Sequence, residues 1–93
     1  MSYRVDMQSP AQRDFDGLPV DMQKQVAKHL RALAEDPRPP GAIRVQDAPK
    51  GSYRIRVGEY RVGYRVDDGT RVVSIWGIGP RGTFYKMAGR RRR

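Results

Sequence analysis

The stretch Tyr53-Arg-Ile-Arg-Val-Gly-Glu-Tyr-Arg-Val-Gly-Tyr-Arg-Val66 alternates between apolar or aromatic residues and residues that are mostly arginine. This period of two predicts a pair of half-buried strands, and the Gly58-Glu59 pair between them has the composition of a two-residue hairpin turn. The turn sets the register, because the residues that flank it must face each other. We therefore predict a β-hairpin whose core face carries the pairs Val57–Tyr60, Ile55–Val62 and Tyr53–Tyr64.

The opposite face of this predicted hairpin carries positive charge. It would hold Arg54, Arg56, Arg61 and Arg65, with Arg56 directly across from Arg61. Like charges at opposed positions of neighbouring strands repel each other by roughly some tenths of a kcal/mol, so this arrangement adds no stability unless an anion binds. Two interpretations stay open: an anion-binding surface, or a solvated polar face of an arginine-rich protein.

The composition of the whole chain points in the same direction. Formal net charge is +9, from 19 basic and 10 acidic residues, and fifteen of the basic residues are arginine. The planar guanidinium matches phosphate well, which favours nucleic acid as a partner. The absence of cysteine excludes disulfides and thiolate metal sites, and no apolar run is long enough to span a bilayer. We expect one soluble cytoplasmic domain over residues 1–86 and a basic tail over residues 87–93.

Hydrophobic periodicity predicts the elements that precede the hairpin. Residues 3–7 alternate between apolar and charged side chains and predict a first strand. Ser9 and Pro10 have the composition of an N-cap and a first helical residue, which predicts a short helix that ends at Gly17. A second helix is expected over residues 19–35, where apolar side chains recur at helical spacing: Met22, Val26, Leu30 and Leu33.

A third antiparallel strand is expected over residues 71–78, after a turn at residues 67–70. Pairing across this turn would place Trp76 on the arginine face, next to Arg61. There the tryptophan could pack structurally or stack on a base or an arginine, and both interpretations stay open. The expected fold is thus α+β, with an antiparallel sheet of about four strands, a helical hairpin on one face and the order β-α-α-β-β-β.

Residues 77–85, Gly-Ile-Gly-Pro-Arg-Gly-Thr-Phe-Tyr, are expected to leave the sheet as a loop. Their glycine spacing matches neither the P-loop nor the dinucleotide-binding motif. Arg81 and Tyr85 would lie just after a central strand, where loops often carry functional side chains. The alternative is that Arg81 is solvated and Tyr85 packs.

Several of these features together resemble the RelE branch of the RelE/ParE toxins of prokaryotic toxin–antitoxin modules. They are the Tyr-x-Val first strand, the Leu-Pro break between the helices, the Asp-Pro helix end, the arginine-rich hairpin and the Ile-Gly-Pro-Arg-Gly-Thr-Phe-Tyr segment. The resemblance covers residues 3–85. It implies a RelE-like fold and a ribosome-dependent mRNA endonuclease that inhibits translation. The implied partners are the ribosome, mRNA and a cognate antitoxin protein. Binding to a membrane is not expected.

Carried over by position, the resemblance implies catalytic roles for Arg54, Arg56, Arg61, Arg81 and Tyr85. The implied reaction is attack of a ribose 2′-hydroxyl on the adjacent phosphate, which requires no metal and no small-molecule cofactor. Arginine can stabilise the developing charge, but its very high pKa makes it a poor general base. The proton acceptor is therefore unassigned, with Tyr85 or Glu59 as possible assistants and Glu59 more simply read as a turn residue.

Other functions stay open because this chain departs from well-known relatives at three positions. Those relatives carry lysines at the positions of Arg54 and Arg56, and often a basic residue at the position of Pro80. The alternatives are a ParE-like inhibitor of DNA gyrase without nuclease activity, and a degenerate toxin that only binds its antitoxin. We expect the Arg90–Arg93 run to be disordered, either in contact with RNA or an acidic antitoxin segment, or simply solvated.

Overall fold

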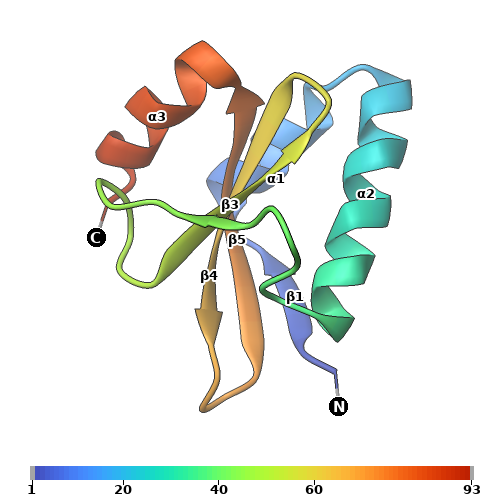
Figure 1. Cartoon of the computed structure of the whole chain (residues 1–93). Coiled ribbons are helices and arrows are strands. Elements are labelled where there is room, and N and C mark those ends of the chain that lie inside the picture. The colour runs from blue at the N-terminus through green and yellow to red at the C-terminus, as the bar shows by residue number, and fades with distance from the viewer. Residues whose placement is uncertain (1, 93) are drawn as a thin grey trace.

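The computed structural model describes residues 2–92, which form a twisted sheet with helices on both faces (Figure 1). The elements, in chain order, are β1 (Arg4–Met7), α1 (Ser9–Asp16), α2 (Val20–Glu35), β2 (Ile43–Arg44), β3 (Ser52–Val57), β4 (Tyr60–Asp67), β5 (Val72–Pro80) and α3 (Arg81–Arg90). The strand order is β1-β5-β4-β3-β2. None of the helices within residues 2–92 is long and apolar enough to cross a membrane.

The α+β class and the helical hairpin on one face are confirmed, with three differences in detail. The sheet has five strands, because the connection after α2 adds the short edge strand β2. It is mixed rather than antiparallel, since β1 pairs in parallel with β5. A third helix, α3, follows the last strand.

The predicted register of the central hairpin is confirmed at every pair. Val57 faces Tyr60, Ile55 faces Val62 and Tyr53 faces Tyr64, while Arg56 lies opposite Arg61. Gly58 begins the turn with φ of +60°, a left-handed conformation that glycine adopts without steric cost. The alternation of the sequence therefore translates directly into a core face and an arginine face.

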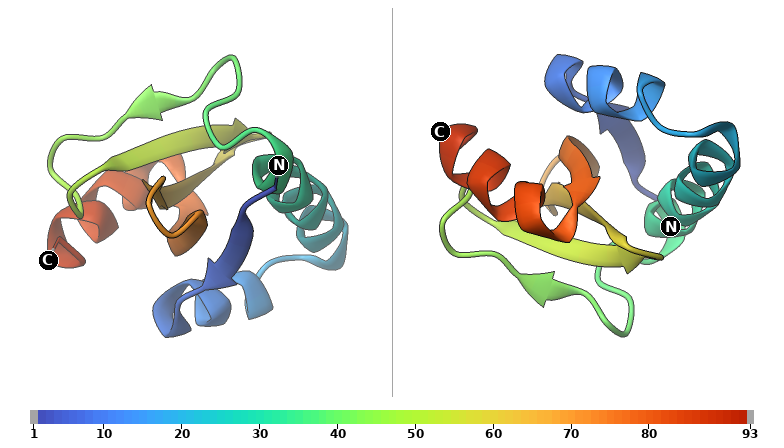
Figure 2. Two further views of the ribbon diagram at one scale, coloured as in Figure 1. Left: turned by 90° about the horizontal axis from the view of Figure 1, so that it is seen from below. Right: turned by 90° about the horizontal axis from the view of Figure 1, so that it is seen from above.

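Helices α1 and α2 cover the core face of the sheet (Figure 2). Helix α1 packs on β5, and α2 packs across β1 and β3. Fully buried side chains from both helices, including Ala11 and Val26, meet strand residues such as Ile75. Ser9 is the first helical residue and not the N-cap, because the backbone N–H of Gln8 still bonds to the Ile75 carbonyl and strand pairing continues up to the helix.

A β-bulge at Trp76 shapes the arginine face. Gly63 pairs with Gly77 and Tyr64 with Ile75, which leaves Trp76 as an extra residue in β5. Its indole lies on the arginine face, as predicted, but α3 covers it: Trp76 is 1% exposed, and its ring centroid is 5.3 Å from that of Phe84. The indole N–H donates to the Ser52 hydroxyl at 2.9 Å. Trp76 therefore packs structurally and is not available to stack on a base.

The expectation of a loop over residues 77–85 is wrong. Residues up to Pro80 continue β5, and Arg81–Arg90 form α3. The helix forms because Phe84, Met87 and Ala88 recur at helical spacing and are buried on the arginine face. The helix continues past residue 87, where the basic tail was expected to begin.

The end of the chain also differs from the expected disordered run. Arg90 ends α3, Arg91 pairs with Asp14, and Arg92 pairs with Asp47. Arg93 lies outside the described residues. Two of the four terminal arginines are therefore bound to carboxylates of the protein itself.

Replacing Gly63 should test the packing of Trp76. A Cβ at this position would lie 2.5 Å from the indole ring, which α3 holds in place. We expect Gly63→Ala to lower the free energy of unfolding by about 1–3 kcal/mol, as overpacking of a core does. Gly82→Ala is the control, since a Cβ there meets nothing within 4 Å. Urea unfolding measures both, and a Gly63→Ala variant as stable as the parent would contradict this packing.

Candidate functional site

A depression of about 200 Å³ lies at the tip of the β3–β4 hairpin. Strand pairing explains why residues from three elements meet there. The start of β4 pairs with the end of β5, Tyr60 with Pro80, so the first residue of α3 lies beside the hairpin tip. The residues that line the depression are Arg56, Gly58, Glu59, Arg61 and Arg81.

The two remaining residues of the predicted site are in contact with each other. The Nε of Arg54 on β3 donates to the hydroxyl of Tyr85 on α3 at 3.3 Å. Tyr85 is 45% exposed although it is aromatic, because only the Phe84 side of its helix turn faces the sheet. The structure therefore brings Arg56, Arg61 and Arg81 into one depression and joins Arg54 to Tyr85 as a second pair.

Arg61 is the unusual member of this cluster. It is only 7% exposed, so the expectation of a fully exposed arginine face is wrong at this position. Its Nε is the one buried side-chain nitrogen or oxygen within residues 2–92 that has no hydrogen-bond partner. One further nitrogen donates to the Tyr60 carbonyl at a long 3.4 Å. Because an unpaired buried donor is costly, this arginine has an unused capacity to bind an anion.

The charges around Arg61 do not neutralise it. Arg56 and Arg81 are exposed and line the same depression, and the one carboxylate there belongs to Glu59. None of the ion pairs found within residues 2–92 involves these three arginines. Their guanidinium groups are therefore available to a phosphate, which accepts forked hydrogen bonds from arginine. Within residues 2–92 there is no group of three or more histidine, cysteine, aspartate or glutamate side chains that could hold a metal ion.

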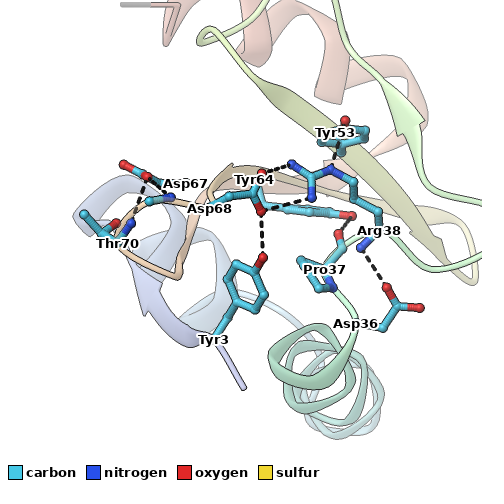
Figure 3. A network of polar contacts seen from close by, with 10 residues as sticks. Tyr3, Asp36, Pro37, Arg38, Tyr53, Tyr64, Asp67, Asp68 and Thr70 are labelled. Atoms are coloured by element: carbon cyan, nitrogen blue, oxygen red, sulfur yellow. Dashed lines mark hydrogen bonds and ion pairs between the residues drawn. The ribbon is translucent and has the colours of Figure 1, made fainter. Parts of the chain in front are cut away.

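The other charged cluster lies at the opposite end of β4 and differs in kind (Figure 3). Arg38, which follows α2, donates to both carboxylate oxygens of Asp68 at 3.2 and 2.9 Å. Its Nε donates to the Tyr53 hydroxyl at 3.1 Å, and the Tyr3 hydroxyl donates to Asp68 at 2.6 Å. The network thus ties the N-terminus, the connection after α2 and the β4–β5 turn together. No pattern in the sequence predicted it, because its members come from four separate segments.

Shifted pKa values belong to this second cluster. The hydrogen bonds from Arg38 and then from Tyr3 hold the pKa of the Asp68 carboxyl below its ordinary value. The hydrogen bond to Asp68 raises the pKa of Tyr3. Burial raises the pKa of Tyr64, whose hydroxyl donates to the Pro37 carbonyl at 2.8 Å. Each of these groups has a hydrogen-bond partner within the protein, so the cluster stabilises the fold and leaves little capacity for a ligand.

The sequence and the fold are both similar to those of known proteins. Residues 5–85 match the sequence model of the family described as the ParE toxin of type II toxin–antitoxin systems, parDE. A search of curated proteins found no match.

Solved structures share the fold. A chain of the RelBE2 toxin–antitoxin complex of Mycobacterium tuberculosis is 26% identical, with a TM-score of 0.75 over 87% of this chain and 100% of that one. A chain of the RelE–RelB complex of Pyrococcus horikoshii is 28% identical, with a TM-score of 0.75 over 88% and 98%. A mutant E. coli RelE in the free state is 24% identical, with a TM-score of 0.79 over 97% of each chain. At this identity, the comparison shows only that the two chains share a fold.

The Arg38–Asp68 network should make stability depend on pH in the acid range. A carboxyl whose pKa is lowered by folding stabilises the protein fully above its unfolded pKa of about 4, and this stabilisation is lost as pH falls through the lower folded value. Asp68→Asn should therefore be less stable than the parent at neutral pH, and the difference should shrink below about pH 4.

Urea unfolding across this pH range measures the difference. Glu35→Gln is the control, because it removes an exposed carboxylate that has no side-chain hydrogen bond or ion pair among the described residues. A stability difference for Asp68→Asn that stays constant with pH would show that Asp68 titrates normally.

Proposed function

Since this chain belongs to the ParE toxin family of type II toxin–antitoxin systems, in the RelE/ParE superfamily, we propose that it is a RelE-type endoribonuclease that cuts mRNA on the ribosome. The chain is a toxin with a RelE-like fold, and the proposal concerns how it acts. The single observation that carries the proposal is Arg61, which is buried with an unpartnered Nε and lines a depression that two further arginines also line. A ribosome-directed toxin of this kind would work in the cytoplasm, where translation takes place.

The depression suits a phosphodiester better than other anions. Three arginines line it, and an exposed aromatic residue, Tyr85, follows Arg81 one turn later on α3. A phosphate that gains a second negative charge in a pentavalent transition state is stabilised by fixed positive charge in a partly buried site. Arg61 is the most effective donor for this purpose, because burial keeps water away from it.

The reaction we propose is an internal transfer at one phosphate of the message. The ribose 2′-oxygen loses its proton and attacks the adjacent phosphorus, a bond from the 2′-oxygen to phosphorus forms, and the bond to the 5′-oxygen breaks. The products are a cyclic phosphate and a 5′-hydroxyl, with no water or other reactant consumed. Arg56, Arg61 and Arg81 would hold the phosphate oxygens throughout, and the ribosome would align the message.

Two proton transfers complete the reaction. Glu59 is the one acidic residue among those that line the depression, so we assign it as the acceptor of the 2′-hydroxyl proton. The Tyr85 hydroxyl accepts a hydrogen bond from Arg54 and thus keeps its own proton free to donate. We assign it to the departing 5′-oxygen.

A cognate antitoxin is the proposed protein partner. The M. tuberculosis and P. horikoshii structures are complexes of a toxin with its antitoxin. With a net charge of +9, this chain would bind an antitoxin whose contacting segments are acidic. Such binding would neutralise the arginine cluster and keep the toxin inactive.

A second candidate function is ParE-like inhibition of DNA gyrase, and the match to the ParE family model favours it. The two functions make opposite demands on the arginine depression, since a gyrase inhibitor needs no phosphate-cleaving site. A supercoiling assay with purified gyrase separates them. Inhibition of supercoiling without cleavage of ribosome-bound message would establish the second function.

Replacing the exposed arginines of the depression should remove cleavage and leave the fold intact. Arg81→Ala should lower the cleavage rate of ribosome-bound mRNA by about 10²- to 10³-fold, the usual loss for one transition-state donor. Arg56→Ala should have a smaller effect in the same direction. The control is Arg31→Ala on α2, which removes the same charge from an exposed position with no side-chain hydrogen bond or ion pair among the described residues. Equal cleavage rates for Arg81→Ala and Arg31→Ala would show that Arg81 is not part of the site.

The role of Glu59 can be tested separately. Glu59→Gln should reduce the maximal rate of cleavage by about 10²- to 10⁴-fold, because glutamine cannot accept the 2′-hydroxyl proton. The variant should still bind ribosomes as the parent does, because glutamine preserves the turn. A parental cleavage rate would mean that Glu59 is only a turn residue.

A further inference from the structure

One half of β5 has no neighbouring strand on the β1 side. Strand β1 pairs only with Val72 to Ile75, because the chain leaves the sheet at Gln8 to begin α1. Beyond this point the edge is closed by side chains. Asp14 of α1 accepts a hydrogen bond from the backbone N–H of Ile78 at 3.0 Å, and Arg91 donates to the Trp76 carbonyl at 2.8 Å.

These two side chains also bind each other. The Arg91 guanidinium donates to the Asp14 carboxylate at 2.7 Å, with side-chain exposures of 27% and 17% respectively. Asp14 comes from the layer on the core face, whereas Arg91 directly follows α3 on the arginine face (Figure 1). The pair, which we call the Asp14–Arg91 clasp, therefore joins the two helical layers around the open edge of β5.

The backbone under the clasp is adapted to close approach. A Cβ at Gly77 would lie 2.6 Å from the Met87 sulfur and 3.1 Å from an Arg91 guanidinium nitrogen. Glycine at this position lets the last turn of α3 and the Arg91 side chain lie directly against β5. The clasp and the Trp76–Phe84 contact together fix the direction of α3 across the sheet.

We propose that Asp14 and Arg91 are positioning residues, which hold α3 so that Arg81 and Tyr85 at its other end face the arginines of the hairpin. This inference rests on the proposed nuclease function for what the positioning achieves. Helix α3 is one continuous segment from Arg81 to Arg90, so a shift at its C-terminal end moves its N-terminal end as well. Arg91 thus has a role within the protein and is not an RNA-binding tail residue.

Arg91 and its two neighbours in the terminal run offer a sharp comparison. Arg92 pairs with Asp47, but both side chains are more than 60% exposed, and such surface pairs contribute little. Arg90 is exposed at the end of α3. Arg90→Ala therefore removes the same charge from the same run without touching the clasp, and serves as the matched control.

The chain contains a built-in probe for the docking of α3. Trp76 is its single tryptophan, and α3 buries the indole completely against the sheet. Arg91→Ala and Asp14→Ala should shift the tryptophan emission to longer wavelength and increase its quenching by acrylamide. Arg90→Ala should leave both unchanged. The measurement is made at a temperature where circular dichroism shows every variant to be folded.

The second readout is cleavage of ribosome-bound mRNA under the same conditions. Arg91→Ala should lower kcat by about tenfold or more, because small displacements of catalytic groups have effects up to about 10²-fold, while KM changes little. Arg91→Lys, which keeps the charge and can still reach Asp14, should recover part of the loss. The Asp14→Ala/Arg91→Ala double variant should be no worse than the poorer single variant, as expected for two residues that act as one pair.

The outcomes separate this inference from the proposed function. Parental fluorescence in both single clasp variants would refute the clasp whether or not the protein is a nuclease. Altered fluorescence with parental kcat would show that the clasp only stabilises the fold, which also overturns the positioning role. A parent chain that cleaves no message would overturn the proposed function, and the positioning role in catalysis with it.

Discussion

The close approach of the Trp76 indole to the backbone of Gly63 determines how the last helix docks on the sheet. The bulge in β5 turns Trp76 and the adjacent Gly77 toward the same side, so that a large aromatic side chain lies on the arginine face of the sheet. This surface would be unfavourable in water, and Phe84 and Ala88 of α3 cover it. The docked helix then carries Arg81 to the hairpin tip. A site built from charge is therefore positioned by an apolar contact.

The two arginine clusters show how one side chain serves two purposes. Arg38 is fully engaged by Asp68 and Tyr53, and its cluster, which includes Tyr3, joins four segments of the chain. Arg61 is buried without a comparable partner. A protein that evolved for stability alone would have paired or replaced such a group, because an unpaired buried charge is destabilising. This contrast is the reason why we propose the hairpin tip, and not the more extensive hydrogen-bond network, as the place where an anion binds.

The hairpin could be predicted in full, because alternation with a period of two and a two-residue turn leave one register that places all six apolar side chains on one face. The grouping of Arg56 with Arg61 followed from the same register. Helix α3 was missed because Gly77, Gly79 and Gly82 give the segment a loop-like composition, although Phe84, Met87 and Ala88 already had helical spacing. The burial of Trp76 depends on this helix and was missed with it. The Asp14–Arg91 clasp joins residues 77 positions apart, and no local pattern reports such a contact.

If the arginine depression cleaves a phosphodiester of the message, cleavage must be visible on ribosomes in the cell. Expression of the chain without an antitoxin, followed by mapping of the 5′ ends of ribosome-bound mRNA, tests this. We expect new 5′ ends within the codons that occupy the decoding site, each with a 5′-hydroxyl. Arrested growth with intact message at those codons would contradict it.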